Sequence, residues 1–270
     1  MEVLVVGAGS LGSLLGGLLA GEHEVTLVGR QPHVDTVAAT GLRVTGAVET
    51  TVHPAAVERP APGTGADLAL VTVKAFDTAG AVETLADVDV DVVCSLQNGL
   101  GNEATLAAGL ETTVLAGTCT YGARLAEPGV VECTGVGEVA LGPRAGGTSA
   151  AADRVGAAFE AAGVETVVAR DMPRRLWEKL AVNAGINAVT ALVRVDNGAL
   201  LVGPGGDPAR AAARETAEVA RGAGVDLDPA EAAAAVDRVA EATAANTSSM
   251  RQDVEAGTRT EVDAINGAVA

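Results

Sequence analysis

The sequence is poor in lysine, aromatic residues and positive charge. Its 270 residues include one Trp, one Tyr and two Phe, and only two of its 18 basic residues are lysines, Lys74 and Lys179. With 35 acidic residues the formal charge is −17. A surface this acidic repels phosphates, so nucleic acid is not an expected partner. Because arginine stays charged in proteins, the two lysines become candidates for proton chemistry.

The chain also lacks paired cysteines and long apolar runs. Cys94, Cys119 and Cys133 form no CxxC motif and leave an odd thiol under any pairing, which favours reduced, buried thiols in a cytoplasmic protein. The apolar N-terminal stretch carries Glu2 and several glycines, so it is not expected to be a signal peptide. No other run is long enough to cross a bilayer.

The composition that remains is rich in alanine and valine, and 48% of the residues are hydrophobic. This is ample for a packed core in one large or two ordinary domains. An acidic, lysine-poor chain resembles the proteins of halophiles that keep salt in the cell. A high-GC genome would produce a similar bias, so both explanations stay open.

The first half of the chain alternates apolar β-branched runs with helical segments, which predicts a parallel, doubly wound sheet. The expected strands are 3–7, 24–29, 68–73, 90–97 and 164–169, with helices at 10–20, from 31, and at 78–86, 101–109 and 148–162. Between 113 and 142 no helix intervenes, so antiparallel strands appended to the sheet are expected there. The fold class is therefore an α/β Rossmann-type domain, predicted over 1–169.

After Asp171 the strand signals stop, which predicts an all-α domain over 170–270. Helices are expected at 171–193, 207–224, 228–246 and roughly 251–266. Asp207 and Asp228 each precede a proline, the pattern of an N-cap followed by Pro in the first turn.

A glycine motif directly follows the first predicted strand and opens the first helix. In such a motif the first Gly permits a tight turn, the second lets a pyrophosphate approach the backbone, and the third allows close helix–sheet packing. This position makes a merely Gly-rich turn the weaker interpretation. The motif residues are Gly7, Ala8, Gly9, Ser10, Leu11 and Gly12.

The end of the second strand indicates which dinucleotide binds. NAD-binding proteins carry an acidic residue there, whereas this chain has Gly29 followed by Arg30. A guanidinium suits the 2′-phosphate of NADP through charge-assisted hydrogen bonds. The alternative is that Arg30 is a solvated surface charge.

Two further polar positions end strands at the edge where doubly wound sheets bind ligands. Lys74 follows the third main strand and Asn98 the fourth. Both are expected to lie toward the nicotinamide. Asn98 could instead be a turn residue before Gly99.

The first helix of the second domain carries a polar stripe. Lys179, Asn183 and Asn187 are spaced i, i+4, i+8 on an otherwise largely apolar helix. Because buried polar groups need partners, the stripe lines either a polar cleft or a helix–helix network. The ammonium favours the cleft, since partial burial lowers the pKa of a lysine and makes a usable proton donor.

The remaining polar residues carry weaker signals. From composition alone, Ser248 and Ser249 are expected to cap a helix and Glu261 to be a solvated charge. His23, His33 and His53 have no metal-ligand spacing and are expected at the surface. No metal site is indicated.

Seven segments in order resemble the ketopantoate reductase (2-dehydropantoate 2-reductase) family, whose members use NADPH in pantothenate and coenzyme A synthesis. They are GAGSLG, VTVKAFD, SLQNGLG, GTCTYGAR, LWEKLAVNAGINAVTAL, NTSSMRQDV and TEVDAING, and they span nearly the whole chain. The resemblance implies a Rossmann domain followed by a helical domain, with the active site in the cleft between them. Relatives of this family continue past the position of Ala270, and have Pro where this chain has Ala188.

The resemblance also implies roles for single residues. Lys179 would donate the proton and bind the keto group. The other substrate-binding residues would be Asn98, Asn183, Asn187, Asn197 and Ser249. The cofactor contacts beyond the glycines would be Arg30, Lys74, Asn98, Ala123 and Glu261; of all these, Asn197, Ser249, Ala123 and Glu261 rest on the resemblance alone.

The predicted function is NADPH-dependent reduction of 2-dehydropantoate by a cytoplasmic enzyme that binds a small keto acid. A homodimer is a possible assembly, but the sequence does not determine the oligomeric state. Two alternatives stay open. The chain could reduce another small keto acid, or it could sense NADP without turnover. Lys179 in an apolar helix argues against a sensor, which needs no proton donor.

Overall fold

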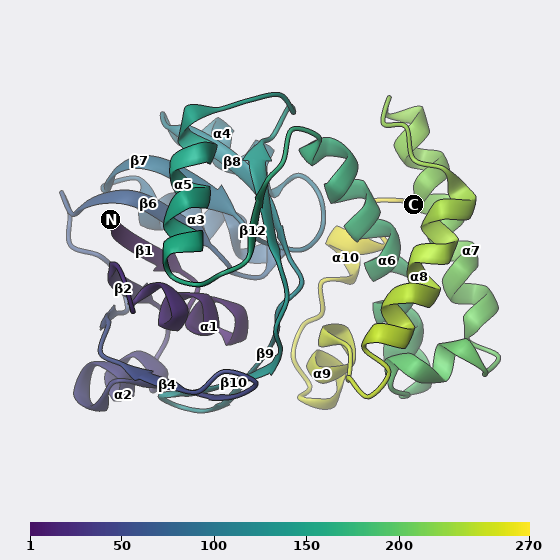
Figure 1. Cartoon of the computed structure of the whole chain (residues 1–270), viewed down its shortest axis with the longest axis horizontal. Coiled ribbons are helices and arrows are strands. Elements are labelled where there is room, and N and C mark those ends of the chain that lie inside the picture. The colour runs from purple at the N-terminus through teal and green to yellow at the C-terminus, as the bar shows by residue number, and fades with distance from the viewer. The chain divides into compact units, whose positions relative to one another are not determined.

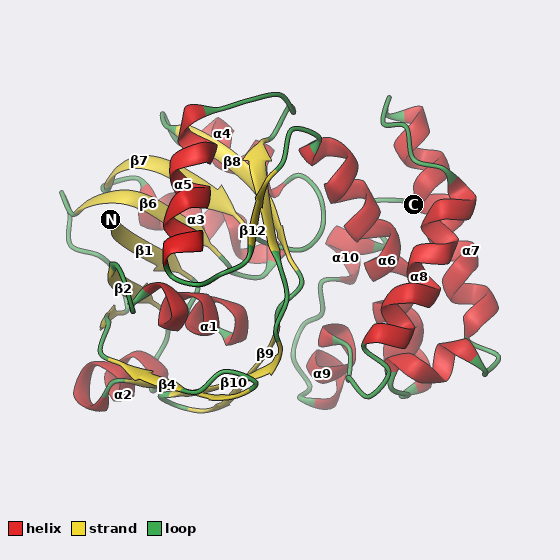
Figure 2. Ribbon diagram, in the orientation of Figure 1, coloured by secondary structure: helices red, strands yellow, loops and turns green.

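The computed structural model describes residues 1–270 and divides the chain into two compact units. The first comprises Met1–Gln97 and Gly101–Met172. The second comprises Pro173–Ala270 together with the short segment Asn98–Leu100. Figure 1 follows the chain from end to end, and Figure 2 shows that strands occur only in the first unit.

The first unit is built on an eight-stranded sheet. Its order is β12-β11-β8-β7-β6-β1-β2-β5, and every neighbouring pair is parallel except β8 and β11. The chain reverses direction of winding at β1, which lies between β2 and β6. The bounds are β1 Glu2–Val6, β2 Glu24–Val28, β5 Ala55–Val57, β6 Gly65–Val71, β7 Asp89–Ser95, β8 Thr113–Cys119, β11 Val139–Pro143 and β12 Thr166–Val168.

Helices cover both faces of this sheet, because alternate residues of each strand are buried on opposite sides. On β1, Val3 and Val5 pack with α1 (Ser10–Leu19) and α5 (Ala150–Ala161). Leu4 and Val6 pack with α3 (Thr78–Leu85) and α4 (Asn102–Gly109) on the other face. In Figure 1, α5 lies in front of the sheet and α3 behind it. The doubly wound Rossmann-type class is thereby confirmed.

A second, four-stranded sheet in this unit was not expected. Its order is β4-β3-β10-β9, with β3 (Leu42–Gly46) parallel to β10 (Val130–Gly135). The other members are β4 (Thr50–Val52) and β9 (Gly122–Glu127). The prediction of antiparallel strands appended to the large sheet is confirmed for β11, which pairs with β8. It was wrong for β9 and β10, which belong to the small sheet and pack beside α1. The short helix α2 (His33–Thr40) precedes β3.

The second unit is helical. It consists of α6 (Met172–Val193, whose first residue belongs to the first unit), the 3₁₀ turn η2 (Asn197–Leu201), α7 (Gly206–Gly222), α8 (Pro229–Ala242), α9 (Ser249–Glu255) and α10 (Val262–Ile265). Asp228 caps α8 by accepting from Ala230 and Glu231, as the Asp-Pro pattern predicts. The single helix expected over 251–266 was wrong, because it is two short helices. None of the helices could span a bilayer.

Candidate functional site: a glycine turn and a polar helix stripe

The glycine turn after β1 is held by backbone contacts that leave no room for side chains at its ends. A Cβ on Gly7, whose φ is +110°, would lie 2.6 Å from the Val73 nitrogen. A Cβ on Gly12 would lie 2.2 Å from the Gly7 carbonyl oxygen and 2.5 Å from Thr72 Oγ1. Thr72 Oγ1 in turn donates to the Gly7 carbonyl at 2.9 Å. This hydrogen bond from Thr72 connects the turn to the end of β6. It was not predicted from the sequence.

The middle glycine differs from the other two, because open space surrounds it. No heavy atom lies within 4 Å of a Cβ built on Gly9. Gly9 is the N-cap of α1, and no side chain caps this helix end. An uncapped helix N-terminus beside open space is suited to bind the phosphates of a dinucleotide. The residues of this turn therefore fit the predicted cofactor.

The strand β9 lies beside this helix start. The Leu125 backbone N–H donates to Ser10 Oγ at 3.0 Å, so the fourth residue of the glycine motif is tied to β9. Ala123 lies two residues earlier on the same strand and is half-buried. The structure thus brings Ala123 to the side of the glycine turn, although it lies more than 100 residues away in the sequence.

At the end of β2 the structure excludes an acidic side chain. A Cβ on Gly29 would lie 2.8 Å from Ala8 Cβ, because the backbone N–H groups of Gly7 and Ala8 both bond to the Val28 carbonyl oxygen at 2.9 Å. The next side chain, Arg30, is exposed and pairs with Asp77 at 3.2 Å. A guanidinium that follows β2 without an acid at the preceding position fits a 2′-phosphate better than a ribose hydroxyl.

The loop carrying Lys74 is held from beneath by a buried amide. Gln97, at the end of β7, donates from Nε2 to the Val73 carbonyl oxygen at 3.1 Å and to Thr78 Oγ1 at 2.8 Å. Thr78 Oγ1 bonds to Asn102 Oδ1 at 2.9 Å. This network fixes both sides of the half-buried Lys74. No role for Gln97 was predicted from the sequence.

In the helical unit, the predicted stripe lies along α6. Lys179 and Asn183 are half-buried, and Asn187 is 8% exposed. Their spacing places them on one side of the helix, one turn apart. The buried apolar residues of α6, such as Leu180 and Ala184, contribute to the core beside it.

The most informative contacts of this unit join three predicted site residues into one chain. Asn183 Nδ2 donates to Asn98 Oδ1 at 3.3 Å, and Asn98 Nδ2 donates to Glu261 Oε2 at 3.4 Å. Glu261 is buried, so the expectation from composition that it is a solvated charge was wrong. Asn98 is therefore more than a turn residue. Its side chain makes both of these hydrogen bonds, and Leu100, two residues later, packs against the core cluster that contains Leu180.

Glycine at position 99 is required for this arrangement. Its φ is +86°, and a Cβ there would lie 2.6 Å from the Ala264 carbonyl oxygen. Only glycine therefore lets the segment after Asn98 approach α10 this closely. The segment Asn98–Leu100 packs as part of the helical unit although it directly follows β7.

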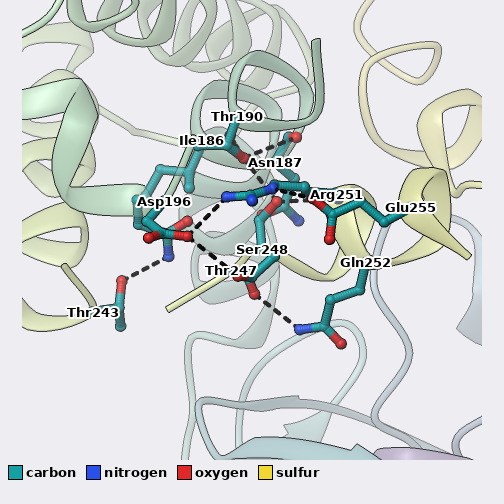
Figure 3. A network of polar contacts seen from close by, with 11 residues as sticks. Ile186, Asn187, Thr190, Asp196, Thr243, Thr247, Ser248, Arg251, Gln252 and Glu255 are labelled. Carbon is teal, nitrogen blue, oxygen red and sulfur yellow. Dashed lines mark hydrogen bonds and ion pairs between the residues drawn. The ribbon is translucent and has the colours of Figure 1, made fainter. Parts of the chain in front are cut away.

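A second polar network lies past the C-terminal end of the stripe (Figure 3). Thr190 and Ser248 are both buried, and their Oγ atoms lie 2.7 Å apart. Ser248 also accepts from the Arg251 backbone N–H at 3.2 Å and so caps α9. Arg251 Nη1 pairs with Asp196 Oδ1 at 2.8 Å. These contacts fix the start of α9 against α6 and the loop after it.

Two of the residues assigned by resemblance lie at this network. Asn197 is buried; its Nδ2 donates to Thr243 Oγ1 at 2.9 Å, but its Oδ1 has no hydrogen-bond partner. A buried unsatisfied carbonyl oxygen is costly, and a ligand hydroxyl would satisfy it. Ser249 begins α9 and is exposed, next to the buried Ser248.

The expectation that all three histidines lie at the surface was wrong for His33. Its ring is buried; Nδ1 accepts from the Gly129 backbone N–H at 3.1 Å, and Nε2 lies 3.0 Å from Ser13 Oγ. Burial lowers the pKa of His33. His53 is exposed, and His23 is half-buried.

Comparison with known proteins identifies the family. The family model described as "Ketopantoate reductase PanE/ApbA" matches residues 3–146, and its C-terminal counterpart matches residues 171–270. The chain belongs to the ketopantoate reductase family. The resemblance inferred from the sequence motifs is therefore confirmed.

Proteins named 2-dehydropantoate 2-reductase are similar along the whole chain. The one from Halobacterium salinarum is 46% identical, covering 100% of this chain and 91% of the relative. The one from Archaeoglobus fulgidus is 43% identical, covering 99% and 89%. The first comes from a salt-adapted organism, in keeping with the acidic, lysine-poor composition.

Solved structures with this fold also match the chain over its whole length. The PanE/ApbA family ketopantoate reductase from Ralstonia eutropha superposes with a TM-score of 0.90 at 35% identity, covering 100% of this chain and 90% of that one. A D-mandelate dehydrogenase in complex with NADH and anilino(oxo)acetate gives a TM-score of 0.91 at 25% identity, with the same coverage.

Proposed function

We propose that the chain reduces 2-dehydropantoate to pantoate with NADPH, a step of pantothenate and coenzyme A biosynthesis. The observation that carries this proposal is the hydrogen-bonded chain from Asn183 through Asn98 to Glu261, one turn from Lys179 on α6. It gathers the polar residues of the family's motifs in a chain that matches reductases of this name over its full length.

In this proposal the first unit binds the coenzyme. Gly9 and the uncapped start of α1 receive the pyrophosphate, and Arg30 binds the 2′-phosphate. Lys74, held by the network around Gln97, contributes a second positive charge. Bound NADPH supplies the hydride.

The helical unit handles the keto acid. Lys179 binds the keto oxygen and donates a proton to it as the alkoxide develops at C2. Asn183, Asn187 and Ser249 hold the hydroxyl and carboxylate groups, and the unsatisfied Oδ1 of Asn197 accepts from a substrate hydroxyl. Asn98 contacts both ligands, and Glu261 contacts the coenzyme. The three cysteines are buried and form no disulfide, which suits a reducing compartment, so the proposed location is the cytoplasm. A homodimer is the proposed assembly.

The test is the oxidation of NADPH followed by absorbance with purified protein and 2-dehydropantoate. Lys179→Arg keeps the charge but cannot donate a proton at neutral pH, so kcat should fall about 10²- to 10⁴-fold while NADPH affinity changes little. Leu192→Ala, at an exposed position on the opposite side of the same helix, is the control and should keep kcat within about threefold. Near-normal turnover in Lys179→Arg would overturn the assigned role, and absence of turnover in the unmodified protein would overturn the function.

A further inference from the structure

The ion pair between Arg30 and Asp77 spans the point where the sheet reverses its winding. Arg30 follows β2, and Asp77 ends the 3₁₀ turn η1 (Ala75–Asp77) that follows β6. These two strands are the neighbours of β1 on either side. The pair therefore crosses the carboxyl end of β1, from which the glycine turn begins.

The backbone of Asp77 is held in place by the 3₁₀ turn. The Asp77 N–H donates to the Lys74 carbonyl oxygen at 2.8 Å, which closes the 3₁₀ turn. Gln97 and Thr78 fix the residues on either side of that turn. The side chain of Arg30, by contrast, is long and 89% exposed, whereas the side chain of Asp77 is 40% exposed. The long Arg30 side chain can therefore turn toward a ligand, whereas the short Asp77 side chain keeps its carboxylate close to this anchored backbone.

This arrangement gives the two coenzymes different neighbours. A 2′-phosphate bound to Arg30 would carry up to two negative charges beside the fixed carboxylate of Asp77, and would compete with it for the same guanidinium. A 2′-hydroxyl is neutral, and it can donate a hydrogen bond to a carboxylate. Because Gly29 leaves no acid at the carboxyl end of β2, Asp77 is the carboxylate in contact with Arg30.

We propose that Asp77 determines coenzyme specificity by opposing Arg30: it weakens the binding of NADPH relative to NADH, and so limits the preference that Arg30 creates. This inference rests on the proposed function for the identity of the coenzyme. It assigns Asp77 to the coenzyme site and predicts that removing its carboxylate strengthens the binding of NADPH relative to NADH.

The experiment is direct titration of NADPH and NADH into the apoprotein, followed by fluorescence, for the unmodified chain and for Asp77→Asn. At low ionic strength NADPH should bind about two- to tenfold more tightly to Asp77→Asn, while NADH binds equally or more weakly. In molar salt the gain for NADPH should shrink toward unity, because the screening length is then only about 3 Å. Asp77→Ser replaces the carboxylate with a smaller neutral group and should change the two dissociation constants in the same directions as Asp77→Asn.

Asp87→Asn is the matched control, since it makes the same change of charge at an exposed position beyond the other end of α3. It should leave the ratio of the two dissociation constants unchanged. An unchanged ratio in Asp77→Asn, or a shift equal to that in Asp87→Asn, would overturn the inference. Because this readout needs no keto acid, it is independent of whether 2-dehydropantoate is reduced.

Discussion

Single glycines of the turn after β1 perform two separate tasks, one in folding and one in binding. Gly12 has to lack a side chain because the Gly7 carbonyl oxygen and Thr72 Oγ1 occupy that position. Gly9 faces open space, so the fold itself does not require glycine there. The sequence motif treats these residues alike, and only the structure separates them.

Alanine substitutions at these two positions should therefore differ. Gly12→Ala should lower the free energy of unfolding by about 1–3 kcal/mol, because overpacking displaces the helix or the turn. Gly9→Ala should leave the melting temperature nearly unchanged but weaken NADPH binding about tenfold or more, since its methyl group takes space meant for the phosphates. Thermal unfolding and NADPH titration of both variants check this. A strong loss of stability in Gly9→Ala would contradict it.

At the scale of elements, the position of α9 relative to α6 depends on the contact between Thr190 and Ser248. Both hydroxyls are buried, and Ser248 also caps α9, which starts with the proposed substrate ligand Ser249. Thr190 lies one turn from Asn187 on α6, so this contact sets the spacing between two proposed substrate ligands, Asn187 and Ser249, on different helices.

Thr190→Val removes one hydroxyl and deprives the buried Ser248 Oγ of a hydrogen-bond partner. The free energy of unfolding should fall by about 1–3 kcal/mol. The KM for 2-dehydropantoate should rise severalfold while the dissociation constant of NADPH stays constant, and Thr190→Ser should restore the KM. Thr216→Val is the control: Thr216 is equally buried and bonds only to the Ala212 carbonyl oxygen of its own helix, so its KM should not change. Equal KM values in both Val variants would contradict a positioning role.

At this scale, the sequence predicted arrangements within one element but not contacts between residues far apart in the chain. The stripe of Lys179, Asn183 and Asn187 lies on one helix, so its spacing alone predicts a shared face. The partners of Asn98 lie 85 and 163 residues away, and no periodicity connects them. The small sheet was missed for the same reason, because its strands are short and join 42–52 with 122–135. The resemblance supplied Glu261 and Asn197, but not their contacts.

At the scale of the whole molecule, stability should depend on pH through His33, which joins α1, α2 and the turn before β10. Its pKa is lower in the folded protein than the ordinary value of 6.5 because of burial. The unfolded chain therefore binds more protons just below that value. The contribution of His33 is fully present above pH 6.5 and is lost as the pH falls through it toward the folded pKa.

Denaturant unfolding at pH 7.5 and at more acidic values tests this. His33→Asn keeps an acceptor for the Gly129 N–H, and its free energy of unfolding should fall less on acidification than that of the unmodified protein. Glu103 is buried with a raised pKa and contributes with the opposite sign, so only the difference between the two proteins reports on His33. The exposed His53→Asn serves as the control and should follow the unmodified curve. Identical pH profiles for all three would contradict the assignment.

The three residues from Asn98 to Leu100 have a consequence for how such genes can recombine. They belong to the helical unit, yet they are encoded between two stretches of the sheet unit. A fragment cut at residue 173 would lose the amide that links Asn183 with Glu261. No single crossover can exchange one unit for that of a relative without mixing parental residues around this amide, so a functional chimera has to transplant the tripeptide together with the C-terminal piece.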